Sequence, residues 1–449
     1  MEDNRLLVLL VVWIATVGIV ALVRWRKKEQ GVGLTLAYLV NLWLIHWVAV
    51  SIYLIPGYKN NDPRLVSLGF EQSVYAVVAF AFGGLALTPL MLKFGRSARA
   101  TAAHELDSNL PKAYVCVGAL SYLALTSALG GLPSASSILA SGQQLVVVGL
   151  GLCCWQAWRQ RNYRMFHAWL GITLLLPFIT IVTRGFIGYG AAAAFSVLIF
   201  VSTFVRSRFV VLVAAILLGY LGISVYVTYM RDRGEIREVV WGGQALRDRV
   251  ERVTSTLENF EWFNPSKAEH LNRIDDRLNQ SFFVGAAVSR LSEIGGYAHG
   301  STLWDALLSL IPRALWPEKP VTAGSGTMVT EYTGIPFVAG TSVGIGHVME
   351  FYVNFGTLGV IIGFMIMGIL VTVLDGMAAE HLARTDLHGF VLWYLPGLSL
   401  LQVGGSLVEV TGSAAASIFV AIVVNKYLER LQRKHAASSL SPVAAGRNA

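Results

Sequence analysis

The residue types best suited to proton transfer stand close together at one place in the sequence. His347 and Glu350 lie three residues apart, directly before an apolar run that begins at residue 351. If a helix begins there, this spacing places both side chains on one face. A neutral imidazole beside a carboxylate can remove a proton from a hydroxyl near neutral pH. We therefore predict a catalytic pair, with a buried interface histidine and a glutamate that interacts with a helix dipole as the structural alternatives.

Arginines and one lysine near the ends of apolar stretches could bind phosphate groups. Arginine suits pyrophosphate because its guanidinium group stays protonated and makes paired hydrogen bonds. Arg231 and Arg233 directly follow an apolar run, and we interpret them as interface anchors. The candidate phosphate-binding residues are Arg184, Arg273, Arg277, Arg290, Arg313 and Lys319.

Ordinary structural roles compete with phosphate binding for several of these residues. Arg184 lies in a turn that is otherwise nearly uncharged, where a lone arginine can extend to lipid headgroups. Arg273 and Arg277 are four residues apart, with Asp275 and Asp276 between them. An internal salt-bridge network is therefore the alternative for these two arginines.

Two more polar residues lie within or beside apolar runs. His46 is in the middle of the second run, and Glu409 is near the start of the last one. Ionisable residues inside a membrane are candidates for a functional site, although hydrogen bonds that support packing explain either residue equally well.

Several common catalytic and binding motifs are absent from the sequence. It contains no Walker A pattern, no nucleotide-binding glycine fingerprint, no His-Glu-x-x-His and no Asp-x-Asp. Cys116, Cys153 and Cys154 fall in apolar runs, and two adjacent cysteines lack the separation that zinc ligands need. We therefore predict no ATP-driven transport, no metal site and no cofactor.

The composition is that of a membrane protein. Of the 449 residues, 55% are hydrophobic and 14% are charged, and the mean hydropathy is +0.58, whereas about a quarter of a soluble protein is charged. A run of roughly 20 apolar residues can span a membrane. Eleven such runs are present, at residues 6–23, 33–55, 73–92, 113–130, 138–158, 165–183, 187–205, 209–229, 351–374, 389–404 and 410–425.

Basic residues concentrate in alternate short loops and predict the orientation of the chain. Lys and Arg stay on the cytoplasmic side of a membrane, and the loop at 24–28 and the tail at 426–434 are both basic. We therefore expect an external N-terminus, a retained first span and a cytoplasmic C-terminus. The net charge of +8 follows mostly from this topology, so it does not indicate nucleic-acid binding.

One large charged segment interrupts the series of apolar runs. We expect an N-terminal membrane domain over 1–229, a large external segment with the proposed site over 230–350, C-terminal spans over 351–425 and a basic, disordered cytoplasmic tail over 426–449. Within the external segment, the spacing of apolar residues over 244–263 predicts an amphipathic helix.

The second half of the external segment contains apolar stretches that are too short to span a membrane. Residues 281–291 and 302–315 are of this kind, which is typical of interfacial or re-entrant helices. The prolines and glycines between 311 and 346 predict an ordered, irregular loop over a cavity, without regular helix or strand.

These features resemble a family, the O-antigen and capsule polymerases of the Wzy type, which join oligosaccharide repeat units. The resemblance rests on Thr-Arg-Gly at 183–185, the large late external loop, Ile-Pro-Arg-Ala-Leu-Trp-Pro-Glu-Lys-Pro at 311–320 and Glu-Phe-Tyr-Val-Asn-Phe-Gly at 350–356. It implies an all-α, GT-C-like glycosyltransferase of the bacterial inner membrane with a periplasmic N-terminus. Such an enzyme transfers a glycan between undecaprenyl-pyrophosphate carriers without a metal.

The resemblance also implies roles and partners. Arg184, Arg290 and Arg313 would contact the pyrophosphates, His347 would be the base, and Glu350 would be the alternative base or would orient the histidine. The partners would be the undecaprenyl-pyrophosphate-linked oligosaccharide, membrane lipid and a chain-length regulator of the polysaccharide co-polymerase type.

Three other functions fit parts of the same sequence. An O-antigen ligase shares this topology but transfers the glycan to a lipid A-core acceptor. A transporter or flippase of lipid-linked glycans predicts internal repeats and a charged central pathway, which we do not find in the sequence. A metal-dependent polyprenyl-phosphate-sugar transferase needs acidic ligands in the first external loop, where only Asp62 and Glu71 are available.

Overall fold

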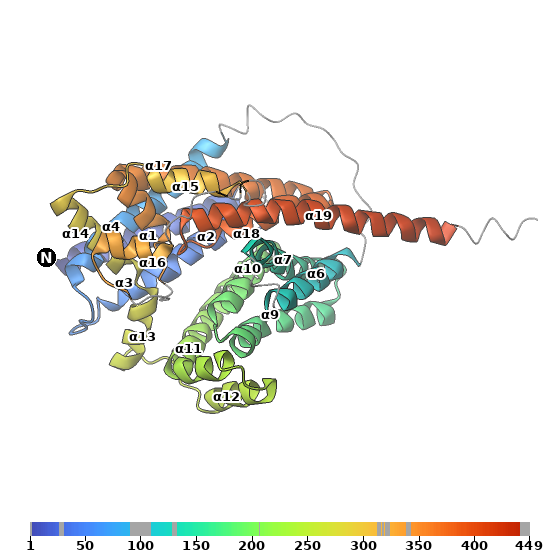
Figure 1. The fold of residues 1–449 in the computed structure, drawn as a ribbon, viewed down its shortest axis with the longest axis horizontal. Helices are drawn as coiled ribbons and strands as arrows, with labels where there is room; N and C mark the ends of the chain where they lie inside the picture. Colours follow the sequence, from blue (N-terminus) through green and yellow to red (C-terminus); the bar gives the residue numbers. More distant parts are fainter. Residues whose placement is uncertain are drawn as a thin grey trace, which may run out of the picture.

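The computed structural model describes residues 2–26, 31–89, 109–127, 133–205, 207–311, 316, 318, 324–337 and 343–440. All regular structure in these ranges is helical (Figure 1). The first half of the chain forms α1 (Glu2–Arg26), α2 (Leu34–Leu42), the π-helical turn η1 (Trp43–Trp47), α3 (Val48–Ile52), α4 (Pro63–Phe82), the π-helical turn η2 (Gly83–Leu87), α6 (Leu110–Leu125), α7 (Pro133–Gln143), α8 (Leu145–Arg159), α9 (Tyr163–Arg184), α10 (Gly188–Phe204) and α11 (Arg208–Trp241). The second half forms α12 (Leu246–Glu258), α13 (Ala268–Leu278), α14 (Gln280–Ile294), α15 (Ser301–Ser309), α16 (Ser325–Thr333), α17 (Gly346–Ala383), α18 (Leu387–Leu400) and α19 (Leu407–Leu440).

Eight helical stretches in the described part of the chain are long and apolar enough to cross a membrane. They are Asn4–Arg26, Leu34–Ile52, Pro63–Leu87, Ala135–Arg159, Tyr163–Arg184, Arg208–Trp241, Gly346–Ala383 and Leu407–Lys434. Three shorter apolar helices, α6, α10 and α18, coincide with the remaining predicted runs. The all-helical fold is thus confirmed, and its long apolar helices agree with a membrane protein. The number of spans and their orientation stay predictions.

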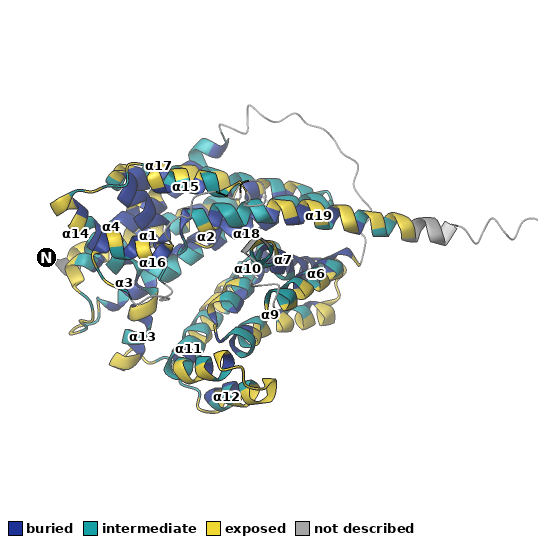
Figure 2. Cartoon of the chain, viewed as in Figure 1, coloured by how far each residue is buried: buried dark blue, intermediate teal, exposed yellow. Residues whose placement is uncertain are grey.

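The most enclosed part of the molecule lies around α4 and α17, where buried residues concentrate (Figure 2). Helix α14, which the sequence places in the external segment, packs closely against α4. A Cβ atom on Gly285 would lie 1.7 Å from the Leu65 carbonyl oxygen, and one on Gly69 would lie 1.9 Å from that of Ser281. Small residues let two helix backbones approach in this way, and they seat α14 among the predicted spans.

A second group of helices, α6 to α11, extends away from the first in Figure 1. Helix α11 is the longest member of this group, and its apolar stretch is poorly covered by protein. Phe209 is 76% exposed and Leu217 is 64% exposed. Apolar side chains in contact with lipid tails need no protein cover, so this face of α11 agrees with a membrane-spanning role.

The helices differ from the sequence predictions at three places. Helix α11 continues through Trp241 because Ile236 and Val240 give its polar end a buried side, so the predicted boundary at 230 lies within one helix. Helix α16 lies in the passage predicted to be irregular, since its nine residues contain no proline and Gly334 ends it with a left-handed φ of 74°. The tail predicted to be disordered from 426 continues α19 through Leu440, and Leu428 is buried there.

The predicted amphipathic helix is confirmed as α12, which packs on α9 and α11 through the buried Val253 and Thr256. Several apolar helices are interrupted. The run at 138–158 breaks between α7 and α8, α17 is kinked where Gly356 adopts a φ of 63°, and a turn over 401–406 separates α18 from α19. The first turn of α17 and the 401–406 turn meet at the candidate site.

Candidate functional site

The first residues of α17 are joined to the turn between α18 and α19. The Gly346 N–H donates to the Gly404 carbonyl at 3.1 Å, and the His347 N–H donates to the Val403 carbonyl at 3.0 Å. From α14, the Gln280 side-chain amide donates to the Gly344 carbonyl at 2.9 Å. The first N–H groups of a helix lack partners within the helix, so these contacts fix where α17 begins. We call this region the α17–α19 junction.

His347 lies in this junction with no exposed surface, and its Nδ1 is 2.8 Å from the Tyr38 hydroxyl. Tyr38 is also fully buried, and His347 is the hydrogen-bond partner of its hydroxyl in the described structure. The phenol therefore donates to Nδ1. Because Nδ1 is then an acceptor, we assign the proton of the neutral ring to Nε2 from this hydrogen-bond pattern. That Nε2 has no hydrogen-bond partner among the described residues.

Glu350 lies on the next turn of α17 and is also fully buried. Its Oε2 accepts a hydrogen bond of 2.6 Å from the backbone N–H of Leu407, in the first turn of α19. A helix N-terminus favours a negative charge because unpaired N–H groups and the helix dipole point at it. Its other oxygen, Oε1, has no hydrogen-bond partner among the described residues. The pair thus presents a donor, His347 Nε2, and an acceptor, Glu350 Oε1.

Glu409, the second carboxylate near this helix end, has a structural role. Its Oε2 accepts from the Ser406 N–H at 3.1 Å, while its own N–H donates to the Ser406 hydroxyl at 3.3 Å. This is a capping box, in which a serine and a glutamate three residues apart satisfy each other's backbone. The other oxygen accepts from the Ser325 hydroxyl at 3.1 Å, which ties α16 to α19.

Sequence reasoning assigned no role to Asn354, which lies one turn after Glu350. Its amide nitrogen donates to the Thr302 hydroxyl at 2.7 Å, and its amide oxygen accepts from the Gly300 N–H at 2.9 Å. These bonds fasten the start of α15 to α17. Asn354 is four residues from Glu350, so both side chains share one helix face. This spacing is the feature of the sequence that could have identified Asn354 as part of the site.

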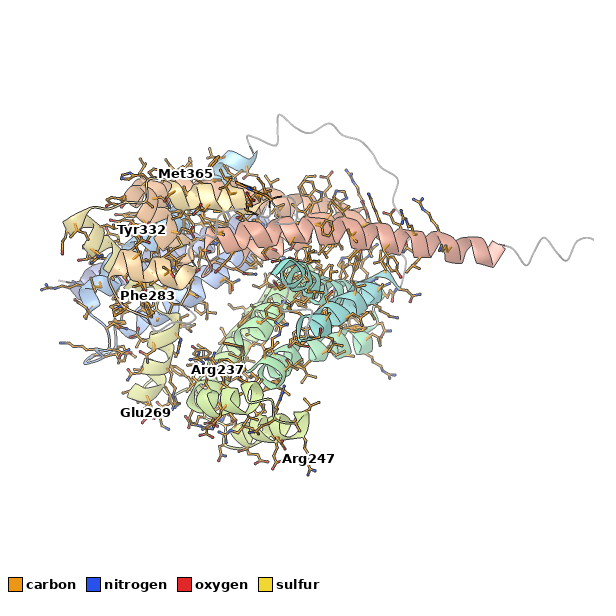
Figure 3. The ribbon with its side chains drawn as sticks, viewed as in Figure 1. Arg237, Arg247, Glu269, Phe283, Tyr332 and Met365 are labelled. Atoms are coloured by element: carbon orange, nitrogen blue, oxygen red, sulfur yellow. The ribbon has the colours of Figure 1, made fainter. Side chains whose placement is uncertain are left out.

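Tyr332 of α16 also lies near the junction. It is mostly buried, and burial raises the pKa of its phenol, with smaller contributions from the Glu331 and Glu350 carboxylates. In Figure 3, Tyr332 is seen on the same side of the molecule as Phe283 of α14, whereas Arg237 lies on the α11 side. A neutral phenol near Glu350 is an additional hydrogen-bond donor for a polar ligand.

Arg184 is held within the protein. It ends α9, and its guanidinium donates to Gln143 Oε1 at 2.8 Å. It also lies over two aromatic rings, 4.3 Å from the centre of Tyr122 and 5.4 Å from that of Tyr189. Cation–π contacts with both rings and the amide bond fix the guanidinium between α6, α7 and α10.

The two arginines of α13 differ in their surroundings. Arg273 is paired with Glu261 at 3.4 Å and with Glu269 at 3.7 Å. No described carboxylate lies within ion-pair distance of Arg277, which is exposed and lies close to Arg233 and Arg237 of α11. The structure therefore separates two residues for which the sequence predicted one role.

Asp275 does not pair with these arginines, so the predicted salt-bridge alternative is wrong in its partners. Its carboxylate instead accepts hydrogen bonds from five side chains, namely Tyr53, Tyr58, Asn60, Asn61 and Asn279, at 2.6–3.2 Å. Burial raises the pKa of both phenols, and the Asp275 carboxylate raises it further, so they remain donors. Asp275 thereby fastens the loop before α4 to α13.

The other predicted cations lie elsewhere. Arg290 is exposed on α14, and its guanidinium lies beside Gly334 at the end of α16, with no carboxylate of the described chain in ion-pair distance. Arg313 and Lys319 lie outside the described residues. The structure thus brings His347 and Glu350 together, but it does not gather Arg184, Arg273, Arg277 and Arg290 around them.

Two more buried polar groups serve packing. His46, in the turn η1, lies 2.9 Å from the Ser281 hydroxyl through Nδ1, which joins the second apolar run to α14. Asp375 of α17 accepts hydrogen bonds from the backbone N–H groups of Val32 and Leu34 and forms an ion pair with Arg24. Sequence reasoning treated Arg24 only as an indicator of orientation, since its distant partner Asp375 stands alone in a long apolar helix.

No group of three or more His, Cys, Asp or Glu side chains in the described ranges could hold a metal ion.

Comparisons with known proteins place the chain in a family. No curated protein and no solved structure matches the chain. A family model described as a domain of unknown function, DUF8712, matches residues 78–430, which is more than half of the chain. The protein therefore belongs to the DUF8712 family.

Proposed function

We propose that the protein is a membrane glycosyltransferase that polymerises oligosaccharide repeat units carried on undecaprenyl pyrophosphate. The observation that carries the proposal is the buried pair at the α17–α19 junction. His347 Nε2 and Glu350 Oε1 are polar atoms without partners in the described structure. Leaving a polar atom unpaired in a protein interior costs about 1–3 kcal/mol. Such a cost is expected where a substrate completes the hydrogen bonds.

The hydrogen-bond pattern supports a division of roles within the pair. Because Tyr38 donates to Nδ1 of His347, we assign Nε2–H as a donor that orients the substrate. Glu350 Oε1 is then the base, which reverses the order of preference given by the sequence. The N-terminus of α19, which donates the Leu407 N–H, favours the ionised carboxylate and offsets part of the cost of burying its charge.

In the proposed reaction, a hydroxyl of the acceptor glycan attacks the anomeric carbon of the donor glycan. The new glycosidic C–O bond forms as the bond between that carbon and the pyrophosphate oxygen breaks. The hydroxyl proton goes to Glu350, and undecaprenyl pyrophosphate leaves with the bonding electron pair. Fixed positive charge on the protein would stabilise this leaving group. Both side chains of the pair are fully buried, so part of the junction has to move when the acceptor enters.

The proposal includes a cellular setting. We infer a location in the bacterial inner membrane, with eleven spans, an external N-terminus and a cytoplasmic C-terminus, and a site that faces outward. A chain-length regulator would be the protein partner. The basic short loops support this orientation.

Reconstitution tests the proposal directly. The purified protein is incorporated into liposomes with an undecaprenyl-pyrophosphate-linked repeat unit, without metal or nucleotide, and the products are separated on a gel. A ladder with repeat spacing is the expected result. A single transfer that occurs only after addition of a lipid A-core acceptor would replace the polymerase with a ligase. With an authentic repeat unit of the source organism, the absence of any covalent product would reject glycosyl transfer.

One observation favours transport of a lipid-linked glycan as the second candidate. Helix α17 is kinked at Phe355 and Gly356, and the 401–406 turn separates α18 from α19. The buried carboxylate of Glu350 connects α17 to the first turn of α19. Transporters often place ion and substrate sites at interrupted helices of this kind. Movement of the intact lipid-linked repeat unit between leaflets, with no change in its covalent structure, would favour this candidate.

A further inference from the structure

Three arginines come together at the polar end of α11, outside the α17–α19 junction. Arg233 and Arg237 lie four residues apart on α11 and therefore share a face. Arg277, near the end of α13, lies one turn after Arg273, whose guanidinium donates to the Val227 carbonyl of α11 at 3.4 Å. Arg277 is close enough to interact electrostatically with both Arg233 and Arg237. Sequence patterns do not group these residues, because 40 positions separate Arg237 from Arg277. We call these three residues the arginine cluster.

Neighbouring arginines on the same helices are neutralised, and the arginine cluster is not. Arg231 pairs with Asp232 and Glu261, and Arg273 pairs with Glu261. No carboxylate in the described ranges lies within 4.0 Å of the cluster's guanidinium groups, although carboxylates are present on both helices. Asp276, adjacent to Arg277, instead accepts a hydrogen bond from Asn60, and Asp232, adjacent to Arg233, instead pairs with Arg231 and Arg252.

The surrounding residues fix the position of the cluster. The Arg237 guanidinium lies 4.2 Å from the ring centre of Phe186 and 5.0 Å from that of Trp241, and its buried Nε has no hydrogen-bond partner in the part of the chain that the structure describes. The indole of Trp241 donates to the Arg184 carbonyl at 3.2 Å, and the Tyr229 hydroxyl donates to the Gly185 carbonyl at 2.8 Å. The turn after α9 is thereby anchored beside the cluster.

The repulsion among three like charges needs a counter-charge. Bringing guanidinium groups together while removing part of their water is unfavourable unless an anion binds. Arg233 and Arg237 are half-buried, whereas Arg277 is exposed, so the cluster is open to solvent on one side. It lies just past the apolar stretch of α11 that ends at residue 229, and is therefore expected at a membrane surface.

We infer that the arginine cluster binds a diphosphate group. Two linked phosphates present enough acceptor oxygens for three planar guanidinium groups, which bind phosphate in a bidentate manner. The diphosphate could belong to a lipid headgroup or to free pyrophosphate. Its identification as the headgroup of the polyprenyl carrier rests on the proposed function, but the inference of an anion site does not.

The position of Arg277 relates this anion site to the junction. Arg277 lies three residues before Gln280, and three residues of chain span at most about 11 Å. The Gln280 amide donates to the Gly344 carbonyl, three residues before His347. The chain therefore connects the arginine cluster to the α17–α19 junction through Gln280, at the start of α14.

Binding measurements on full-length protein test the inference. Pyrophosphate, a short-chain polyprenyl diphosphate and the matching polyprenol are titrated against protein in nanodiscs of neutral lipid. We expect the two diphosphates to bind and the uncharged polyprenol to bind much more weakly. Arg233→Ala and Arg277→Ala should each weaken diphosphate binding by about tenfold to a hundredfold. Arg247→Ala, which removes an exposed arginine of α12, is the matched control and should bind normally.

The outcomes separate the ligand sources and the two proposals. Equal affinity of both diphosphates means that the site recognises the diphosphate alone, and tighter binding of the lipid form means that it also recognises the chain. Equal binding by wild type, Arg233→Ala and Arg277→Ala would overturn the inference, as would an equal loss in Arg247→Ala. Diphosphate binding that depends on the cluster, without any ladder in the reconstituted assay, would uphold the anion site and reject the polymerase.

Discussion

Two regions place polar groups in opposite ways. One is the α17–α19 junction, and the other is the α11–α13 corner, which holds Arg231, Arg273 and the arginine cluster. At the junction, His347 and Glu350 are fully buried, and helix ends and backbone groups hold them in place. At the corner, ion pairs neutralise Arg231 and Arg273, while no carboxylate of the described residues pairs with the arginine cluster, which is partly exposed. The junction is thus organised for positioning, and the corner is organised for charge.

This difference teaches which property a substitution will affect. A change at the junction alters groups that protein contacts hold in one arrangement, so it should act on the rate of a reaction. A change at the corner removes a charge that water also stabilises, so it should act on affinity and on salt dependence. The predictions below test this division, beginning with the largest expected effect.

Replacement of Glu350 should have the largest effect. Glu350→Gln keeps the shape of the side chain and an oxygen that can accept from the Leu407 N–H, but it cannot take up a proton. We expect polymer formation to fall by about 10²–10⁴-fold, which is the usual contribution of a general base. The measurement is the initial rate of ladder formation in the liposome assay.

The comparison is sharpened by a diphosphate titration of the same variant. Glu350→Gln should bind pyrophosphate with the affinity of the wild type, because it leaves the arginine cluster intact. If Glu350→Gln polymerised at the wild-type rate, Glu350 would have no part in the chemistry, and the junction would have only a structural role.

Replacement of Asp275 should destabilise the attachment of α13 to the loop before α4. Asp275→Ala leaves five side-chain donors without their acceptor in a site where Asp275 itself is 2% exposed. We expect a loss of about 3 kcal/mol in the free energy of unfolding. Asp276→Ala is the control, since that carboxylate is exposed and makes one hydrogen bond, to Asn60. If the hydrogen bonds of Asp275 did not contribute to stability, both variants would unfold at the same temperature in detergent.

A methyl group on Gly285 should disturb the seat of α14 and thereby the junction that Gln280 supports. The added Cβ would lie 1.7 Å from the Leu65 carbonyl oxygen, so the two helices have to move apart. We expect Gly285→Ala to lower stability by about 2 kcal/mol. Gly171→Ala on α9, where nothing lies within 4 Å of the new Cβ, should be neutral or slightly stabilising. Indistinguishable melting temperatures for these two variants would contradict the close packing of α14.

Apolar periodicity and composition predicted most of the helices, because a membrane span is recognisable as a run of some 20 apolar residues. They missed the seating of α14 against α4, since a contact through Gly69 and Gly285 depends on residues that are 216 positions apart. They also missed α16, where the prolines on either side obscured a short helix ended by Gly334.

The site was predictable only where its members are local in sequence. The three-residue spacing of His347 and Glu350 identified a pair that shares one helix face. The partners that decide its chemistry, Tyr38 and the Leu407 N–H, come from distant elements and left no pattern near residue 347. The same reason hid the arginine cluster, because like charges on separate helices show no periodicity.

The smallest expected effect concerns Glu261, at the charged corner. Hydrogen bonding from Arg231 lowers the pKa of Glu261 below its ordinary value of about 4.5, with a further contribution from His270. A carboxyl whose pKa is lower in the folded state adds stability that is fully present above its unfolded pKa. That stability is lost as the pH falls through the folded pKa. Because the side chain is partly exposed, we expect less than about 1 kcal/mol.

The test compares wild type with Glu261→Gln at two pH values. The wild type should melt at a slightly higher temperature at pH 7, and the difference should shrink as the pH falls through the lowered pKa of Glu261, where the wild-type carboxyl also becomes neutral. Glu258→Gln, an exposed carboxylate of α12 outside the ion-pair network, should show no such difference at either pH. High salt should reduce the effect of Glu261→Gln but leave that of Gly285→Ala unchanged. A salt-independent difference for Glu261 would show that the corner, like the junction, depends on packing more than on charge.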